Sequence, residues 1–286
     1  MKGIILAGGT GSRLHPLTLA VNKHLLPIHD KPMIYYPLAT LMQACIRTVL
    51  VISSPKDLPM FQRLLKGGSH LGLDISYVSQ SSPAGIAQAL ILAESFIADE
   101  PFSLILGDNF FDGRRFEKRL HAEFRSQVGA VVITCPVSDP YRFAILDSDQ
   151  DGRPISITEK PTAPATNQAV TGLYFYPASA VSVAKGIQPS SRGLLEITAV
   201  NNHYLRNNLL KVVSLSEEDS WFDAGTHESL REASQTVHDK EATEGRKIGC
   251  LEEIAYRRGW IDPAQLSRLA ANSGNQAYRD YLRCLL

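Results

Sequence analysis

The sequence predicts an α/β protein in which helices cover both faces of a largely parallel sheet, and three observations lead to that class. Of the 286 residues, 44% are apolar, which is enough for a sizeable core. Short apolar segments alternate along the chain with longer segments of helical period. Segments such as 48–52 are apolar at nearly every position, which indicates a strand buried on both faces between layers of helices.

The predicted elements alternate regularly up to residue 136 and then change in character. Strands are predicted at residues 2–6, 48–53, 74–79, 102–106 and 130–136, and helices at 32–44, 57–65, 86–96 and 116–127. Further on, extended segments separated by polar turns indicate a small, partly antiparallel addition, at residues 142–146, 154–158 and 169–176. The C-terminal segment has helical character, and Asp262 followed by Pro263 is typical of a helix N-cap and first helical position.

Charge, hydropathy and cysteine usage exclude several classes of protein. The 29 basic residues equal the 29 acidic ones, so the chain lacks the basic excess of a nucleic-acid-binding protein. No apolar stretch approaches the roughly 20 residues that span a bilayer. The apolar start is broken at Gly8 and Gly9, so we interpret residues 2–6 as a strand rather than a signal peptide. Four widely separated cysteines match neither a metal knuckle nor a disulfide framework, which predicts a reduced, cytoplasmic protein.

A glycine-rich loop follows the first strand. In the segment from Gly8 to Arg13, glycines let backbone N–H groups approach an anion closely, as in a phosphate-binding loop. A dinucleotide-binding fingerprint would need a third glycine where Leu14 stands, and the Gly-Lys-Ser/Thr of a Walker A loop is absent. Arg13 instead closes the loop, and a guanidinium suits a highly charged ligand such as a nucleoside triphosphate. The alternative is an ordinary turn with a solvated arginine.

Two aspartates are candidate metal ligands. Asp108 follows the strand at 102–106, and sheets of this class present their ligand-binding groups at the carboxyl ends of strands. A carboxylate together with substrate phosphates is the usual arrangement for Mg²⁺. Asp223 is the second candidate. For Asp108 the alternative is a turn aspartate. Lys23 lies beside an apolar stretch on the expected ligand side, where it is either a phosphate partner or a solvated amine.

Two more segments suit a sugar phosphate and a nucleobase. Glu159 and Lys160 follow a predicted strand that Pro161 ends, so the carboxylate is placed to accept bonds from sugar hydroxyls and the amine to hold a phosphate. The alternative is a solvated charge pair. Gln80 offers an amide donor and acceptor to a base edge, and Gly85 leaves room for the base, although alone they indicate only a turn.

Taken together, these segments resemble the glucose-1-phosphate thymidylyltransferases, a family of sugar nucleotidyltransferases. The segments that carry the resemblance, in family order, are residues 8–14, Lys23, 30–38, 106–109, 159–161, 170–176, 192–193, 195–198, 225–227 and 252–257. The resemblance therefore spans almost the whole chain.

The resemblance implies a fold, a reaction and partners. The fold would be a Rossmann-like three-layer sandwich with a mostly parallel central sheet, a small partly antiparallel addition and C-terminal helices. Residues 1–240 would form the nucleotidyltransferase domain, with a nucleotide half at about 1–136 and a sugar-phosphate half at about 137–240, and 241–286 a helical appendage. The enzyme would use Mg²⁺ to make dTDP-glucose and pyrophosphate from dTTP and glucose 1-phosphate for dTDP-sugar (rhamnose-type) biosynthesis, as a homotetramer built as a dimer of dimers. The charge balance and the lack of a long apolar stretch separately predict no nucleic-acid or membrane partner.

The resemblance also implies roles for individual residues. Arg13, Lys23 and Lys160 would be catalytic, and Asp108 and Asp223 would hold the metal. The nucleotide would contact Leu6, Gly8, Gly9, Thr10, Gly11, Ser12, Arg13, Gln80, Pro83, Gly85 and Asp108. The sugar phosphate would contact Asn109, Ala144, Glu159, Lys160, Val170, Gly172 and Arg192.

Departures from the family pattern leave the choice of substrate open. His24, Ala84 and the pair Phe143-Ala144 stand where the family usually has glutamine, aspartate and Tyr-Gly. The Cβ of Ala144 would narrow the sugar pocket. UTP in place of dTTP, another hexose 1-phosphate, and a catalytically weak nucleotide-sugar binding protein therefore stay as alternatives. Leu14 and Arg13 disfavour a nicotinamide dehydrogenase.

The family also implies a second, regulatory nucleotide site, and two segments near it differ here. Arg114-Arg115 stand where a histidine is common, and residues 217–220 are mostly acidic where a Gly-Arg-Gly-like segment is usual. Acidic groups repel phosphate, although the two arginines would attract it. We therefore expect dTDP-rhamnose-type products to inhibit weakly, by competing with dTTP at the catalytic site.

Overall fold

A nine-stranded central sheet organises the chain. The computed structural model describes residues 1–122 and 129–286. Within these residues, one half of the sheet is parallel, in the order β6 (Phe102–Leu106), β1 (Lys2–Leu6), β4 (Thr48–Ser53) and β5 (Asp74–Ser79). The long strand β11 (Gln168–Tyr176) pairs antiparallel with β6 and joins the other strands, β8 (Ala130–Pro136), β9 (Ala144–Ser148), β10 (Pro154–Glu159) and β12 (Leu210–Ser214). The predicted α/β class and partly antiparallel addition are confirmed.

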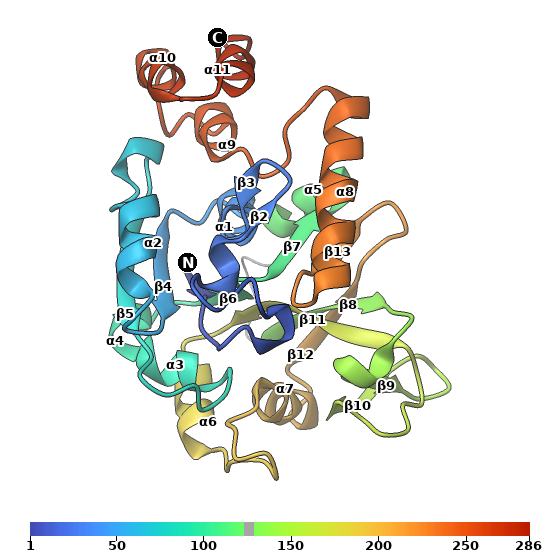
Figure 1. Ribbon diagram of the computed structural model, residues 1–286. Coiled ribbons are helices and arrows are strands. Elements are labelled where there is room, and N and C mark those ends of the chain that lie inside the picture. The colour runs from blue at the N-terminus through green and yellow to red at the C-terminus, as the bar shows by residue number, and fades with distance from the viewer. Residues whose placement is uncertain (123–128) are drawn as a thin grey trace.

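Successive residues of the parallel strands enter two different cores. Ile4 and Leu50 pack on one side of the sheet, whereas Ile5 and Val51 pack on the other. All four side chains are buried, because helices cover both faces. The first core takes in α3 (Gln88–Leu92), α4 (Glu94–Ile97), α6 (Ala180–Gly186) and α7 (Ile197–Arg206), and the second α1 (Tyr35–Gln43), α2 (Leu58–Leu65) and α5 (Arg114–Ala122). Figure 1 shows these layers.

Some boundaries differ from those predicted. The helix predicted at 32–44 begins only at Tyr35, because the preceding residues form the short hairpin of β2 (Pro27–Ile28) and β3 (Lys31–Pro32). The helix predicted at 86–96 is divided at Ala93, whose ψ of 3° is not helical. The predicted helix at 116–127 overlaps α5, and its residues 123–127 lie outside the described part of the chain.

Of the four C-terminal helices, the first runs along one side of the molecule and the other three stack at one end (Figure 1). They are α8 (His227–Glu244), α9 (Leu251–Arg257), α10 (Pro263–Asn272) and α11 (Gln276–Arg283). The Asp262 side chain accepts a hydrogen bond from the Gln265 backbone N–H at 2.6 Å, which confirms the predicted N-cap of α10. Apolar residues of α9, α10 and α11 belong to the same core as α1. Helix α8 continues without a break across residue 240, where we predicted the end of the nucleotidyltransferase domain. That domain boundary stays a prediction.

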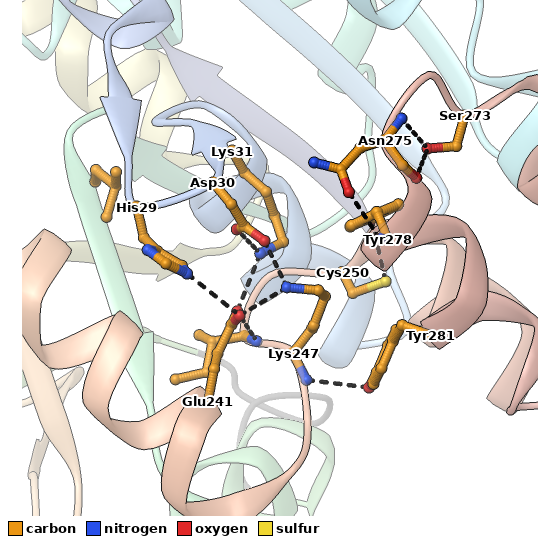
Figure 2. Close-up of polar contacts among 12 residues, drawn as sticks. His29, Asp30, Lys31, Glu241, Lys247, Cys250, Ser273, Asn275, Tyr278 and Tyr281 are labelled. Atoms are coloured by element: carbon orange, nitrogen blue, oxygen red, sulfur yellow. Dashed lines mark hydrogen bonds and ion pairs between the residues drawn. The ribbon is translucent and has the colours of Figure 1, made fainter.

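Lys247 joins the appendage to the body of the protein (Figure 2). Its ammonium contacts the carboxylates of Asp30, in the hairpin turn, and Glu241, on α8; Lys31 bridges the same two carboxylates. The Lys247 backbone N–H donates to the Tyr281 hydroxyl on α11 at 3.0 Å. Burial alone would raise the pKa of Asp30, but the two lysines outweigh it and lower that pKa. This alternating ring of charges therefore fastens hairpin, α8 and α11 together.

No helix in the described ranges is long and apolar enough to cross a bilayer.

Replacing Lys247 tests whether this ring fastens the appendage. Lys247→Met leaves the largely buried Glu241 carboxylate and the more exposed Asp30 carboxylate with one fewer cation. Breaking a buried pair such as Lys247–Glu241 costs about 3 kcal/mol. We expect the free energy of unfolding to fall by about that amount, and chymotrypsin to cleave near Tyr278 and Tyr281 sooner. In the control Lys185→Met, which breaks the exposed pair with Glu94, we expect a loss below about 1 kcal/mol. Equal losses would contradict the role of Lys247.

Candidate active site

A cavity of about 360 Å³ lies beyond the carboxyl ends of β1 and β6, where sheets of this class bind their ligands. It gathers most of the residues that the sequence singled out. These are Leu6, Gly8, Gly9, Arg13, Lys23, Gln80, Pro83, Gly85, Asp108, Asn109, Ala144, Glu159, Lys160, Val170, Gly172 and Asp223. Segments far apart in the chain thus share one cavity, whereas the role of each residue stays a prediction.

Four residues that we expected in the site do not line this cavity. Thr10 lines a neighbouring cavity of about 310 Å³. The Gly11 carbonyl accepts a hydrogen bond from the Thr18 hydroxyl at 2.7 Å, and Ser12 is exposed at the start of a short 3₁₀ turn. Arg192 lies behind Glu159 and donates to its carboxylate at 2.9 Å. In this arrangement Arg192 orients Glu159 rather than facing the cavity.

Long-range strand pairing brings the two candidate metal ligands to the same place. Asp108 follows β6 after a single glycine, Gly107, and Asp223 ends β13 (Ser220–Asp223). β13 pairs antiparallel with β7 (Asn109–Asp112), so that Asp223 lies opposite Asn109. The Ala224 backbone N–H donates to the Asp108 carbonyl at 2.9 Å. The backbone therefore holds both aspartates at one end of this two-stranded ribbon.

The pKa values of the two carboxyl groups move in opposite directions. Burial alone would raise the pKa of Asp108, but the Lys23 ammonium that bonds to it lowers that pKa well below its usual range. Burial and the negative charge of Asp108 raise the pKa of Asp223 to about 6. Because one negative charge disfavours the other, the pair is a place where an additional cation would be stabilised.

Two arginines approach Asp223. A Cβ at Gly225 would lie 2.6 Å from an Nη atom of Arg13, so the absence of a side chain at Gly225 gives the Arg13 guanidinium its room. The guanidinium of Arg142 lies 3.5 Å from the Asp223 carboxylate. Arg142 lines the cavity, and our sequence analysis missed it; its only signal was its position directly before the Phe143-Ala144 pair.

On the side of the cavity where we expect the sugar phosphate, the backbone of Lys160 is unusual. Lys160 has a φ of 45°, in the left-handed region that non-glycine residues rarely adopt, and its N–H donates to the Phe143 carbonyl at 3.0 Å. Such backbone strain is often found at functional positions. Beside it, one carboxylate oxygen of Glu159 accepts from Arg192 and the other from the Thr198 hydroxyl at 2.6 Å. Glu159 is thus held from two sides.

On the side of the cavity where we expect the nucleobase, Gln80 is held by its neighbours. Its amide N–H donates to Gln88 at 2.7 Å, and a Cβ at Gly8 would lie 2.8 Å from its amide oxygen. Gly85 has a φ of 111° and packs on Leu195, whose carbonyl would lie 2.3 Å from an added Cβ, so no other residue fits there.

His24 is buried beside Lys23. Burial and the positive charge of Lys23 lower the pKa of His24 to about 3, so its ring is neutral at physiological pH. This residue also lines the cavity.

A second cavity of about 570 Å³ lies between the body and the appendage, with Lys118, Arg246 and Arg257 in its lining. Asp219 of the acidic segment accepts hydrogen bonds from the Phe116 backbone N–H, at the start of α5, and from the Ser216 hydroxyl. The carboxylate of Asp219 is therefore engaged by the protein itself. The side chains of Arg114 and Arg115 lie outside the described part of the structure, and weak product inhibition stays a prediction.

Comparison with known proteins relates the whole chain to one family. A model of the nucleotidyl transferase family matches residues 2–240. A glucose-1-phosphate thymidylyltransferase of Neisseria meningitidis is 48% identical over 100% of this chain and 99% of its own. One of Mycobacterium tuberculosis is 43% identical over 100% of this chain and 99% of its own. A Bacillus anthracis structure described as the same kind of enzyme, with sucrose bound, has a TM-score of 0.76 at 41% identity, covering 84% of this chain and 96% of its own. A UDP-glucose pyrophosphorylase is similar in fold, with a TM-score of 0.73 at 22% identity.

The raised pKa of Asp223 predicts how stability depends on pH in metal-free protein. Because this pKa is above the 3.8 of an ordinary aspartate, the folded protein gains stability from the extra proton at low pH and loses it as pH rises through about 6. Asp223→Asn removes the repelled charge, so at pH 7 we expect it to increase the free energy of unfolding by about 1 to 3 kcal/mol. Denaturant unfolding at about pH 4.5 and 7 checks this, since the gain should shrink at the lower pH. An equal gain at both pH values would contradict it.

Proposed function

Because the chain belongs to the glucose-1-phosphate thymidylyltransferases of the nucleotidyl transferase family, we propose that it transfers the thymidylyl group of dTTP to glucose 1-phosphate with Mg²⁺, releasing pyrophosphate. The observation that supports this most is the single cavity that holds both candidate metal carboxylates, the cations Arg13, Lys23 and Lys160, and Glu159. We further propose, on the family resemblance alone, a cytoplasmic homotetramer that supplies dTDP-sugar biosynthesis.

The chain's own residues suit an in-line transfer without a protein nucleophile. The sugar phosphate is itself the nucleophile, and its attack on the α-phosphorus brings two anions together. The protein therefore has to position the reactants and neutralise their charge. In this proposal Arg13 stabilises the departing pyrophosphate and Lys160 holds the incoming phosphate. Each such contact is worth about 3 kcal/mol by analogy with donors to oxyanions.

Asp108 and Asp223 fit a hard divalent cation. Both offer carboxylate oxygens, and the raised pKa of Asp223 reflects a repulsion that a shared cation would relieve. When bound, Mg²⁺ would neutralise triphosphate charge and polarise the P–O bonds. Lys23, already bonded to Asp108, would share that carboxylate with the cation.

A pyrophosphate-release assay with dTTP, glucose 1-phosphate and Mg²⁺ tests the proposal. We expect turnover only when all three are present. Binding of nucleotide without turnover would instead support a weak binding protein. Crossing dTTP and UTP with several hexose 1-phosphates identifies the preferred pair, and an Ala144→Gly variant that accepts bulkier sugars would show that the Ala144 Cβ limits the sugar pocket.

Loss of one metal carboxylate should lower turnover without disturbing the fold. For Asp108→Asn we expect turnover at saturating substrates to fall by at least about 10²-fold, because the cation that neutralises the triphosphate is held less well. The control Asp112→Asn replaces another buried aspartate, on β7, which pairs with Lys240 and Arg246 away from the cavity; it should keep its turnover. Near-normal turnover of Asp108→Asn at saturating Mg²⁺ would refute the metal role.

Loss of the Lys160 amine should affect the two substrates unequally. Lys160→Ala is expected to raise KM for the sugar phosphate by about 10-fold or more, with little change for dTTP, because one phosphate-holding cation is lost. Lys160→Gly serves as a matched variant: it should show the same kinetic loss, but it should unfold at a higher denaturant concentration than Lys160→Ala, since glycine suits the φ of 45°. Equal changes in both KM values would contradict the assigned role.

A further inference from the structure

Asn109 connects the metal-binding carboxylates to the sugar-phosphate side of the cavity. Its side chain is buried, with 3% of its surface exposed. The amide oxygen accepts hydrogen bonds from the indole N–H of Trp221 at 2.7 Å and from the backbone N–H of Gly172 at 3.0 Å. The amide nitrogen donates to the Asp108 carboxylate at 3.1 Å. One amide thus contacts β13, β11 and the end of β6.

These three contacts permit only one orientation of the amide. The indole N–H and the Gly172 N–H can donate but not accept, so both require the amide oxygen. A rotated amide would turn its own N–H groups toward these two donors and its oxygen toward the Asp108 carboxylate. Rotation would lose all three bonds and leave the buried Gly172 N–H and the half-buried Trp221 indole N–H unpaired. The two donors therefore keep the amide nitrogen directed at Asp108.

The surroundings of Asn109 leave it little freedom. A Cβ at Gly172 would lie 2.6 Å from the amide carbon and oxygen of Asn109, so Gly172 provides the room for this contact. The Trp221 ring is itself held by an edge contact with Phe143, with ring centres 5.3 Å apart. In the β7–β13 ribbon, Asp223 lies directly opposite Asn109. Asn109 is therefore adjacent to both aspartates: it follows Asp108 in the sequence and pairs with Asp223 in the ribbon.

We propose that Asn109 is a positioning residue for the Asp108 carboxylate, and that Trp221 acts on metal binding through Asn109. This inference rests on the proposed metal role of Asp108. Residues that hydrogen-bond to a metal ligand fix its orientation, and their loss typically weakens metal affinity by about 10- to 100-fold. Trp221 acts one bond further away. Losing its N–H should cost the equivalent of one neutral hydrogen bond, which is about a 5-fold weaker affinity.

Metal binding measured without substrates tests the proposal. Electron paramagnetic resonance of free Mn²⁺ gives the affinity of the wild type, Trp221→Phe and Asn109→Ser. Trp221→Phe keeps an aromatic ring at the site but removes the indole N–H. We expect a loss of about 5-fold for Trp221→Phe and about 10-fold or more for Asn109→Ser. Trp260→Phe is the matched control, since it changes the other of the two tryptophans, on the appendage side, and should bind Mn²⁺ normally.

The double variant shows whether Trp221 acts through Asn109. If it does, adding Trp221→Phe to Asn109→Ser causes no further loss of Mn²⁺ affinity. Unchanged affinity of Trp221→Phe, or losses that multiply in the double variant, would overturn the proposal. If Trp221→Phe bound Mn²⁺ normally and, in a separate transfer assay, raised only the KM for sugar phosphate, Trp221 would be a sugar contact and the proposal would be wrong. Because the Mn²⁺ assay contains no nucleotide or sugar, absence of thymidylyl transfer by the wild type would count against the proposed function alone.

Discussion

Two carboxylates, those of Asp108 and Asp223, lie in a buried part of the cavity where the charge of one opposes the ionisation of the other. Keeping both ionised requires positive charge nearby, and the structure supplies it from several directions. Lys23 bonds to Asp108, whereas Arg142 lies beside Asp223 and Arg13 packs against Gly225. The same cations are the ones that a triphosphate and a sugar phosphate would need. The cations that stabilise the two carboxylates therefore also give the cavity positive charge that would attract anionic substrates.

The two sides of the cavity that we propose for the nucleobase and the sugar phosphate are connected by one segment of chain. The Leu195 backbone N–H donates to the Ala84 carbonyl at 2.8 Å, next to Gly85 on the nucleobase side. Close by in the same segment, Glu196 accepts from Arg192, which in turn holds Glu159 on the sugar side. Glu196 is largely buried, so this charge arrangement is fixed before a substrate arrives. The surroundings of Gly85 and of Glu159 thus both depend on the packing of the one loop that carries Arg192, Leu195 and Glu196.

Features encoded locally were predictable from the sequence, whereas those made by distant pairing were not. The strand at Phe102–Leu106 and the position of Asp108 at its end follow from apolar patterning, and the N-cap of α10 follows from Asp262. Periodicity could not show that β13 pairs with β7, so only the family resemblance placed Asp223 beside Asp108. Arg142 gave no distinctive signal, because a single arginine in a turn has the same appearance whether it faces a cavity or solvent. The start of α1 at Tyr35 could not be predicted either, because the strands of the hairpin before it are only two residues long and give no recognisable pattern.

A direct measurement of the Asp223 carboxyl group would test the central claim that repulsion between the two aspartates is relieved by a bound cation. Its pKa can be followed by carboxyl-carbon NMR titration, with Asp223→Asn to assign the signal. In metal-free enzyme the account predicts a pKa of about 6, and addition of Mg²⁺ should lower it. Asp108→Asn should lower it as well, even without metal, because the opposing charge is gone. An ordinary aspartate pKa in metal-free enzyme, unchanged by Mg²⁺ and by Asp108→Asn, would contradict the account.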